Sequence, residues 1–206
     1  METFSKSAAT SVRGRPRSFA VDAITERALG VFWERGYEAT SLEALVVATG
    51  INLSSLYAAF GSKRGLFRAA MERYEHHVGS ALEALAAGTS GLDDVLRFVE
   101  WVRAGISSAA QPPGCLIVNT MVEFATEDAE IGEVTQRYRR RVRRSLQAAL
   151  TRAERSGEIE QRTGAARAVL VQAAMFGALA TARSGALDDA DAMLRGLLTE
   201  VRRWRS

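Results

Sequence analysis

The pattern of apolar and polar residues is helical along most of the chain. Apolar side chains recur three and four positions apart, as in Ile24, Ala28, Val31 and Phe32, which share one face of a helix that ends at Gly36. No stretch keeps the apolar–polar alternation of a β-strand, and no internal repeat is evident. The pattern predicts an all-α protein.

Capping signals then predict two short helices. Thr40 and Glu43 form the sequence T-x-x-E, a capping box at the start of a helix that ends at Gly50. Asn52 is placed to cap a second short helix that ends at Phe60. Two short helices joined by a turn containing glycine are typical of a helix-turn-helix, whose second helix enters the DNA major groove.

The rest of the chain predicts longer helices separated by Gly and Pro. Ser62 is placed to cap the first of them, and breaks fall around the GTSG and PPG segments. The predicted helices cover residues 63–85, 93–102, 115–125, 131–156, 165–184 and 188–204.

The second short helix carries side chains suited to DNA. Ser54 and Ser55 offer small hydroxyls near its N-terminal end, and Tyr57 presents a hydroxyl one turn later. A capped helix pair inside an all-α core fits the same pattern. Geometry alone therefore leaves DNA binding and a structural role open.

Composition narrows the class of protein. The 206 residues suffice for one large or two small domains, and 47% hydrophobic with 25% charged residues is ordinary for a soluble globular chain. The single cysteine, Cys115, excludes an intramolecular disulfide and a cysteine metal cluster. The first residues do not resemble a signal peptide, and the stretch 168–182 is shorter than the roughly 18 residues of a membrane span. We therefore expect a cytoplasmic protein.

The formal net charge of +3 is small, so the positions of the basic residues say more about possible partners than their total does. Arg13, Arg15 and Arg17 lie on a segment that reads as a flexible arm, stiffened by Pro16. Such an arm fits a narrow A·T-rich minor groove, and a solvated basic tail is the alternative. The denser cluster of six arginines in residues 137–144 wraps around a helix, which favours an ion-paired surface over a second nucleic-acid patch.

The sequence offers little for catalysis. His76 and His77 are the only histidines and, as neighbours on a helix, point about 100° apart, so they do not chelate one metal ion. Without a Ser-His-Asp set or a Gly-rich phosphate loop, we predict no catalytic residue, no metal and no cofactor. Cys115 would sit in the first turn of a helix, where the dipole favours a thiolate sensor; a small buried hydrophobe is the favoured interpretation.

Residues 28–67 resemble the DNA-binding domain of TetR-family transcriptional regulators. Three motifs carry the resemblance, which extends from about residue 18 to 77: RGYEATS at 35–41, ATGIN at 48–52 and LY-x-x-F-x-SK-x-x-L at 56–66. Farther on, the resemblance is architectural, except that GCLIVN at 114–119 is similar to a stretch in one AcrR-like branch of the family.

The resemblance implies three parts and a set of DNA contacts. The parts are a basic arm (1–17), a DNA-binding domain (18–78, with its helix-turn-helix at about 41–60) and a ligand-binding and dimerisation domain (79–206). Thr40, Ser41 and Lys63 become expected phosphate contacts. The chain departs from common family residues at Ser54 and Ala59, which bears on operator sequence and affinity. The expected DNA-binding residues are Arg13, Arg15, Arg17, Thr40, Ser41, Asn52, Ser54, Ser55, Tyr57 and Lys63.

The resemblance also implies a homodimer on a pseudo-palindromic operator, with a small-molecule effector that releases it. The last two helices are expected to form the dimer interface, although one chain could bury both internally. Its expected residues are Val169, Ala173, Phe176, Gly177, Ala180, Leu194, Leu197, Leu198 and Val201. The expected effector-binding residues, each of which could equally be core, are Phe98, Trp101, Val102, Ile117, Asn119, Met121, Phe124 and Phe176.

The sequence thus predicts a homodimeric repressor controlled by a ligand. A ligand-independent regulator or an activator of the same family is the nearest alternative. A helical small-molecule-binding protein or enzyme that does not bind DNA is the alternative from another class. The operator, the regulated genes and the effector are not identified by the sequence.

Overall fold

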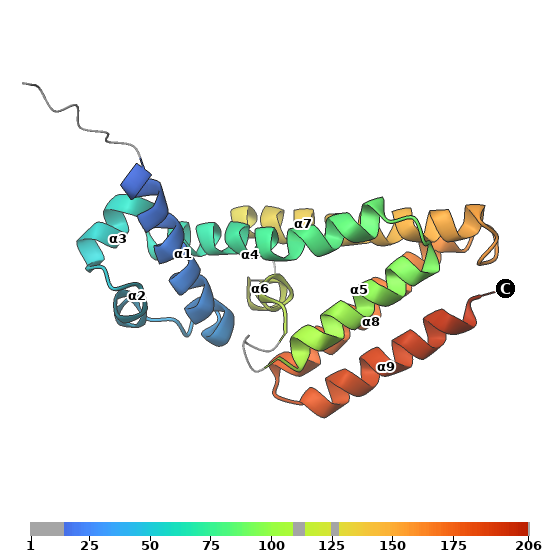
Figure 1. Ribbon diagram of the computed structural model, residues 1–206. Helices are drawn as coiled ribbons and strands as arrows, with labels where there is room; N and C mark the ends of the chain where they lie inside the picture. Colours follow the sequence, from blue (N-terminus) through green and yellow to red (C-terminus); the bar gives the residue numbers. More distant parts are fainter. Residues whose placement is uncertain (1–14, 109–113, 125–127, 206) are drawn as a thin grey trace, which may run out of the picture.

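The computed structural model describes residues 15–108, 114–124 and 128–205, and the chain in these ranges is entirely helical apart from its connections (Figure 1). The helices are α1 (Arg15–Arg35), α2 (Leu42–Thr49), α3 (Leu53–Phe60), α4 (Lys63–Ala87), α5 (Leu92–Ile106), α6 (Leu116–Phe124), α7 (Ala129–Arg155), α8 (Gly164–Arg183) and α9 (Leu187–Arg203). The all-α prediction is confirmed.

The first three helices and the start of α4 enclose one apolar core at one end of the molecule (Figure 1). Phe32, Leu45, Leu56 and Phe67 are completely buried there, one from each helix. Phe32 and Phe67 meet edge to face with ring centroids 4.9 Å apart, a geometry that adds to the stabilisation from burial. This core fixes how α3 is presented to solvent.

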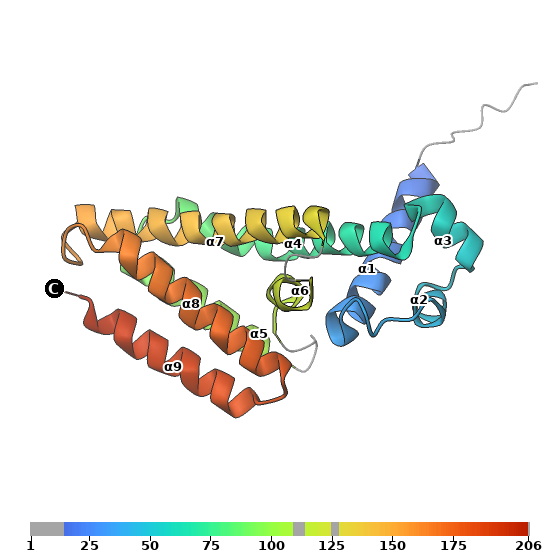
Figure 2. The ribbon, with the colours of Figure 1, turned by 180° about the vertical axis from the view of Figure 1, so that it is seen from behind.

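The long helix α4 connects that end of the molecule to the other. It packs along α7, and α5, α8 and α9 form a further layer that crosses this pair obliquely (Figures 1 and 2). α6 is short and lies between α4, α7 and α8 on one side and the first three helices on the other. α4 is therefore the helix that belongs to both ends of the molecule.

Two predicted helix starts are confirmed and one is wrong. Asn52 caps α3 by accepting a hydrogen bond from the Ser55 amide, and Ser62 caps α4 through the Gly65 amide. The cap of α2 is Ser41, whose Oγ accepts from the Ala44 amide, and not Thr40. The helix begins one residue later than predicted because the Thr40 hydroxyl is already bonded to the Gly36 carbonyl at 2.5 Å.

The first helix begins earlier than the sequence indicated. α1 begins at Arg15, so Arg15 and Arg17 belong to its first turn rather than to an extended strand. Pro16 is compatible with this start, because the first-turn amides of a helix lack an intrahelical acceptor in any case. Arg13 lies outside the described residues.

α8 is long and apolar enough to cross a membrane by length and composition, contrary to the sequence interpretation, which counted a shorter stretch. Only 39% of its most apolar window is buried. One side of α8 packs on α7 and α9, as in a core helix. Its other apolar side is exposed, and such an exposed apolar surface is typical of an interaction site.

Candidate DNA-binding surface and effector cavity

The exposed side of α3 carries the polar residues expected to meet DNA. Asn52, Ser54, Ser55 and Tyr57 are all exposed, while Leu56 is fully buried and anchors the helix. Ser54 donates its hydroxyl hydrogen to the Asn52 side chain at 2.8 Å, which ties it to the cap. Ser55 and Tyr57 are thus the side chains of α3 that are freest to reach a base or phosphate.

Thr40 does not belong to this surface, which corrects the sequence expectation. Its side chain is completely buried, and its hydroxyl donates to the Gly36 carbonyl. It closes the turn between α1 and α2 and is not accessible to a phosphate. Ser41, the neighbouring residue, is exposed at the start of α2.

Lys63 lies at the start of α4, beside the amides at that helix N-terminus, as expected for a phosphate contact. Its Nζ is 4.3 Å from the centroid of the Tyr37 ring, which holds the ammonium in a cation–π contact. Tyr37 belongs to the turn after α1. The interaction therefore links this cation to the same turn that positions α2.

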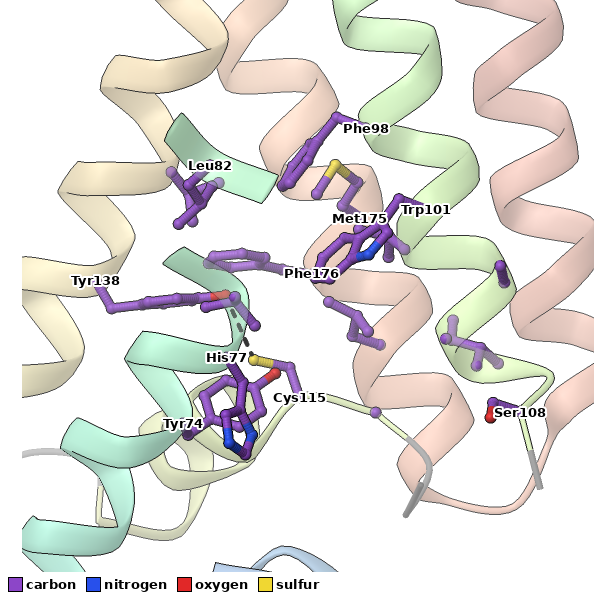
Figure 3. Close-up of a pocket in the computed structure, with 18 of the residues that line it drawn as sticks. Tyr74, His77, Leu82, Phe98, Trp101, Ser108, Cys115, Tyr138, Met175 and Phe176 are labelled. Atoms are coloured by element: carbon purple, nitrogen blue, oxygen red, sulfur yellow. Dashed lines mark hydrogen bonds between the residues drawn. The ribbon is translucent and has the colours of Figure 1, made fainter. Parts of the chain in front are cut away.

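A cavity of about 300 Å³ lies between α1, α4, α5, α7, α8 and the segment just before α6 (Figure 3). Of the expected effector-binding residues, Phe98, Trp101, Val102 and Phe176 line it. Several other lining residues could not be predicted from the sequence, because helical periodicity identifies buried residues but not which of them face an empty volume. These include Trp33, Tyr74, His77, Leu82, Cys115, Tyr138 and Met175.

The other four expected residues lie elsewhere. Ile117 is completely buried in the core, and Phe124 packs on the Tyr37 and Phe67 rings. Met121 and Phe124 line a smaller hollow against α7, and Asn119 lines another beside Gly36. The segment just before α6 therefore lines the main cavity through Gly114 and Cys115, and the last turn of α6 packs against the DNA-binding end.

One end of the cavity is polar and is formed by the Tyr74, Cys115 and Tyr138 side chains (Figure 3). The Cys115 thiol donates to the Tyr138 hydroxyl with Sγ and Oη 3.8 Å apart, and the Tyr74 ring lies beside the same sulfur (Figure 3). Burial raises the pKa of both phenols well above their ordinary range and raises the pKa of the Cys115 thiol. The thiolate suggested by the helix position is thus disfavoured, and the buried thiol is the correct interpretation.

Three contacts join the region around the cavity to the DNA-binding end. Glu123, near the end of α6, accepts hydrogen bonds from the Tyr37 and Glu38 amides at 3.0 and 2.7 Å. Arg183 of α8 donates to the Glu34 carbonyl at the end of α1. His77 of α4, which lines the cavity, pairs with Glu26 of α1 at 3.2 Å.

The expected dimer residues divide into two groups. Leu194, Leu197, Leu198 and Val201 are buried inside the chain, where α9 packs on α5 and α8, so they do not form an outer surface. The α8 residues face outward to different degrees: Val169, Ala173 and Ala180 are exposed, Gly177 is half-buried, and half-buried Phe176 lines the cavity. Exposed Leu170 and Met193, missed in the interface list, extend this surface.

Two of the six arginines in the cluster on α7 form ion pairs, which agrees with the ion-paired surface that the sequence favoured, and a third bonds a neutral amide. Arg137 pairs with Glu75 at 3.5 Å and Arg141 with Glu83 at 3.2 Å, both on α4, and Arg143 donates to Gln172 of α8. Among the described residues, no group of three or more His, Cys, Asp and Glu side chains could hold a metal ion.

Comparison with known proteins places this architecture in a family. The family described as bacterial regulatory proteins, tetR family, matches residues 24–70, and the tetracyclin repressor-like C-terminal domain matches residues 91–198. The chain belongs to the TetR family and is a DNA-binding transcriptional regulator.

Two curated relatives are transcriptional repressors. The chain is 34% identical over 161 residues to the transcriptional repressor ComR of Escherichia coli, covering 77% of each chain. It is 31% identical over 135 residues to the E. coli transcriptional repressor BdcR, covering 62% of this chain and 64% of the relative.

Solved structures agree over nearly the whole chain. The regulator CifR, a cysteine mutant in complex with 26-bp double-strand operator DNA, superposes with a TM-score of 0.76 at 31% identity, covering 90% of this chain and 98% of CifR. A TetR regulator from Chloroflexus aurantiacus superposes with a TM-score of 0.80 at 22% identity, covering 93% of this chain and 96% of that chain, which supports the fold.

Proposed function

We propose that this regulator is a homodimeric repressor that leaves its operator when a small molecule fills the cavity between α1, α4, α5, α7 and α8. One observation carries the proposal: Cys115, the residue just before α6, lines the cavity, and Glu123, near the end of α6, is bonded to the turn before α2. The curated repressors and the operator complex of CifR support its DNA-binding part.

The DNA contact is assigned to Ser55 and Tyr57 of α3, with Ser41 and Lys63 at neighbouring helix starts binding phosphates. All four lie at least partly exposed on the helix-turn-helix and its flank. Small hydroxyls and an ammonium suit phosphate oxygens and base edges. The divisions 1–17, 18–78 and 79–206 serve as the working domain limits, with the correction that α1 begins at Arg15.

The second copy is assigned to the exposed apolar side of α8 and its neighbour α9. Val169 and Leu170 are 41% and 61% exposed, and Met193 is 42% exposed, which is unusual for large apolar side chains in a core helix pair. Gly177 lets Met193 approach closely, since a Cβ there would lie 3.3 Å from the Met193 methyl. A two-fold contact of this surface would pair two recognition helices for a pseudo-palindrome.

Effector binding acts by differential affinity for the two arrangements of the DNA-binding end. A ligand that moves the start of α6 or the middle of α4 alters the contacts of Glu123 and His77 with α1 and the turn after it. Two recognition helices about 34 Å apart would then no longer match one face of the DNA. We propose that the protein works by binding alone, without catalysis, in the cytoplasm.

The experiment is a gel shift with DNA from the region upstream of the gene, at several salt concentrations. The expected result is salt-sensitive binding to a pseudo-palindromic fragment by a dimer, with repression of a reporter placed behind that fragment. No specific binding to any such fragment would overturn the proposal, and reporter activation would favour the activator alternative.

A further inference from the structure

We propose that the effector cavity takes a neutral, largely apolar compound that carries one hydrogen-bond-accepting oxygen, such as a ketone, ester or amide. This inference rests on the proposed function, because it names the class of compound that would occupy the same cavity. It follows from the way that apolar and polar groups are distributed along the cavity wall.

The larger part of the wall is apolar and rich in aromatic rings (Figure 3). Phe98 and Trp101 stack with centroids 5.8 Å apart, and Phe176, Leu82 and Met175 face the same volume. Trp101 remains 46% exposed, so its ring lies between the cavity and solvent. A hydrocarbon or aromatic body gains burial against this wall, and about 300 Å³ is at the small end of ligand pockets.

The polar end has more hydrogen-bond donors than it uses. Tyr74, Cys115 and Tyr138 each carry one hydrogen on oxygen or sulfur, and one hydrogen bond joins two of them, from the Cys115 thiol to the Tyr138 hydroxyl. That bond uses the thiol hydrogen. The hydroxyl hydrogens of Tyr138 and Tyr74 are left to donate, and a ligand oxygen in the cavity would accept one of them.

A charged ligand is disfavoured by the same wall. Within the described part of the chain, the cavity lining includes no Lys, Arg, Asp or Glu side chain. Burying an ionised group without a partner costs several kcal/mol, so a carboxylate or ammonium would lose more than the apolar contacts supply. His77, which can carry a charge, is engaged by Glu26 of α1, and Glu26 also pairs with Arg73 at 2.7 Å.

Four probes with one phenylalkyl body test this class. They are 4-phenylbutan-2-one, butylbenzene, 3-phenylpropanoate and 4-phenylbutan-2-amine, which differ in the end group: neutral acceptor, no acceptor, anion and cation. Binding is measured on the full-length protein by calorimetry and by quenching of tryptophan fluorescence, to which Trp33 and Trp101 contribute as cavity residues. We expect the ketone to bind best, butylbenzene about three- to tenfold more weakly, and the two ions more weakly still.

Tyr138→Phe identifies the polar end, and Tyr57→Phe on the exposed side of α3 is the matched control. Tyr138→Phe is expected to weaken ketone binding about three- to tenfold while leaving butylbenzene binding unchanged, which shows that the cavity is intact. Tyr57→Phe should change neither. If Tyr138→Phe does not fold, Tyr74→Phe provides the same comparison at the other hydroxyl of the set.

Two results would overturn this inference: binding of the anion or the cation at least as tight as that of the ketone, or binding of none of the probes. Failure of the proposed function looks different. Ketone binding without any change in operator affinity, measured by gel shift on the same sample, would support the ligand class and contradict ligand-controlled release.

Discussion

Glu123 accepts a hydrogen bond from the backbone amide of Tyr37, with Oε2 and N 3.0 Å apart, although the two residues are 86 positions apart in the chain. The second carboxylate oxygen accepts from the Glu38 amide. Gly36 allows this approach, since a Cβ there would lie 3.1 Å from the carboxylate and its φ of +83° suits glycine. The end of α6 is thereby joined to the turn that positions the helix-turn-helix.

The first prediction concerns this contact. Glu123→Ala should lower operator affinity about tenfold without effector, or about 1.4 kcal/mol, because the turn after α1 loses an acceptor that orients it. The operator affinity of Glu123→Gln should lie between those of the unmodified protein and Glu123→Ala, since the one oxygen of the Gln amide can still accept a hydrogen bond. Gel-shift titration measures the effect. Glu133→Ala, at an exposed carboxylate on α7, is the control, and equal affinities for all variants would refute the coupling.

Substitutions can distinguish residues that contact DNA from residues that stabilise the fold. Tyr57→Ala and Ser55→Ala should each weaken operator binding by about 1–3 kcal/mol with an unchanged melting temperature, because both side chains are exposed. Thr40→Ala should do the reverse and lower the free energy of unfolding by about 1–2 kcal/mol, because its buried hydroxyl closes a turn. Thermal melts beside gel shifts separate the two effects. A DNA-specific effect of Thr40→Ala would reinstate it as a phosphate contact.

Lys63 should act through phosphate charge. Lys63→Ala is expected to weaken binding to specific and non-specific DNA alike, and to reduce the slope of log affinity against log salt by about one. Affinity is measured between 50 and 200 mM salt, as roughly the range over which phosphate contacts are lost. Arg140→Ala, at an exposed arginine on α7, should leave the slope unchanged. An unchanged slope for Lys63→Ala would remove this residue from the interface.

The exposed side of α8 should control the oligomeric state. Leu170→Asp is expected to yield a folded monomer, because two-fold contact would bury the carboxylate without a partner. Val122→Asp, at an apolar residue that is 75% exposed on α6, is the matched control and should remain dimeric. Leu197→Ala should instead lower unfolding free energy by about 2–5 kcal/mol, since it is buried inside the chain. Analytical ultracentrifugation distinguishes these outcomes, and a dimeric Leu170→Asp would move the interface elsewhere.

Alkaline pH should destabilise the cavity wall. Burial raises the pKa of Cys115 in the folded state, so the folded chain holds this proton when the unfolded chain releases it. The stabilisation is complete below the unfolded thiol pKa of about 8.5 and is lost as the pH rises above it. Urea unfolding at pH 7 and 9.5 should show a decrease that is smaller in Cys115→Ala. An equal decrease in the free energy of unfolding of both proteins would show that titratable groups other than Cys115 cause it.

Much of the fold follows from local sequence signals. The spacing of Ile24, Ala28, Val31 and Phe32 and the caps at Asn52 and Ser62 predicted helices that the structure contains, because periodicity and capping depend on neighbours within one or two turns. The exposed residues of α3 were accessible to the same reasoning, since the face opposite buried Leu56 must meet solvent.

Other features required the packing of distant segments. The sequence placed Thr40 on the DNA-facing surface and the apolar residues of α9 in a dimer interface, but apolarity and position do not say which neighbour covers a side chain. The apolar residues of α9 are buried by contact with α5 and α8, and Thr40 is buried in the turn at Gly36. For Cys115, the favoured interpretation as a small buried hydrophobe agrees with the structure, because burial raises the thiol pKa and disfavours the thiolate that the helix position allowed.

The sequence by itself determined the helical class, the helix-turn-helix with Ser55 and Tyr57 on its recognition helix, and the resemblance to TetR regulators. Only the tertiary structure decided that Tyr74, Cys115 and Tyr138 meet at one end of a cavity and that Glu123 reaches the turn after α1. The physical reason is range. Helix propensity and capping act over a few residues, whereas cavities, hydrogen-bond sets and couplings arise where segments far apart in the sequence pack together.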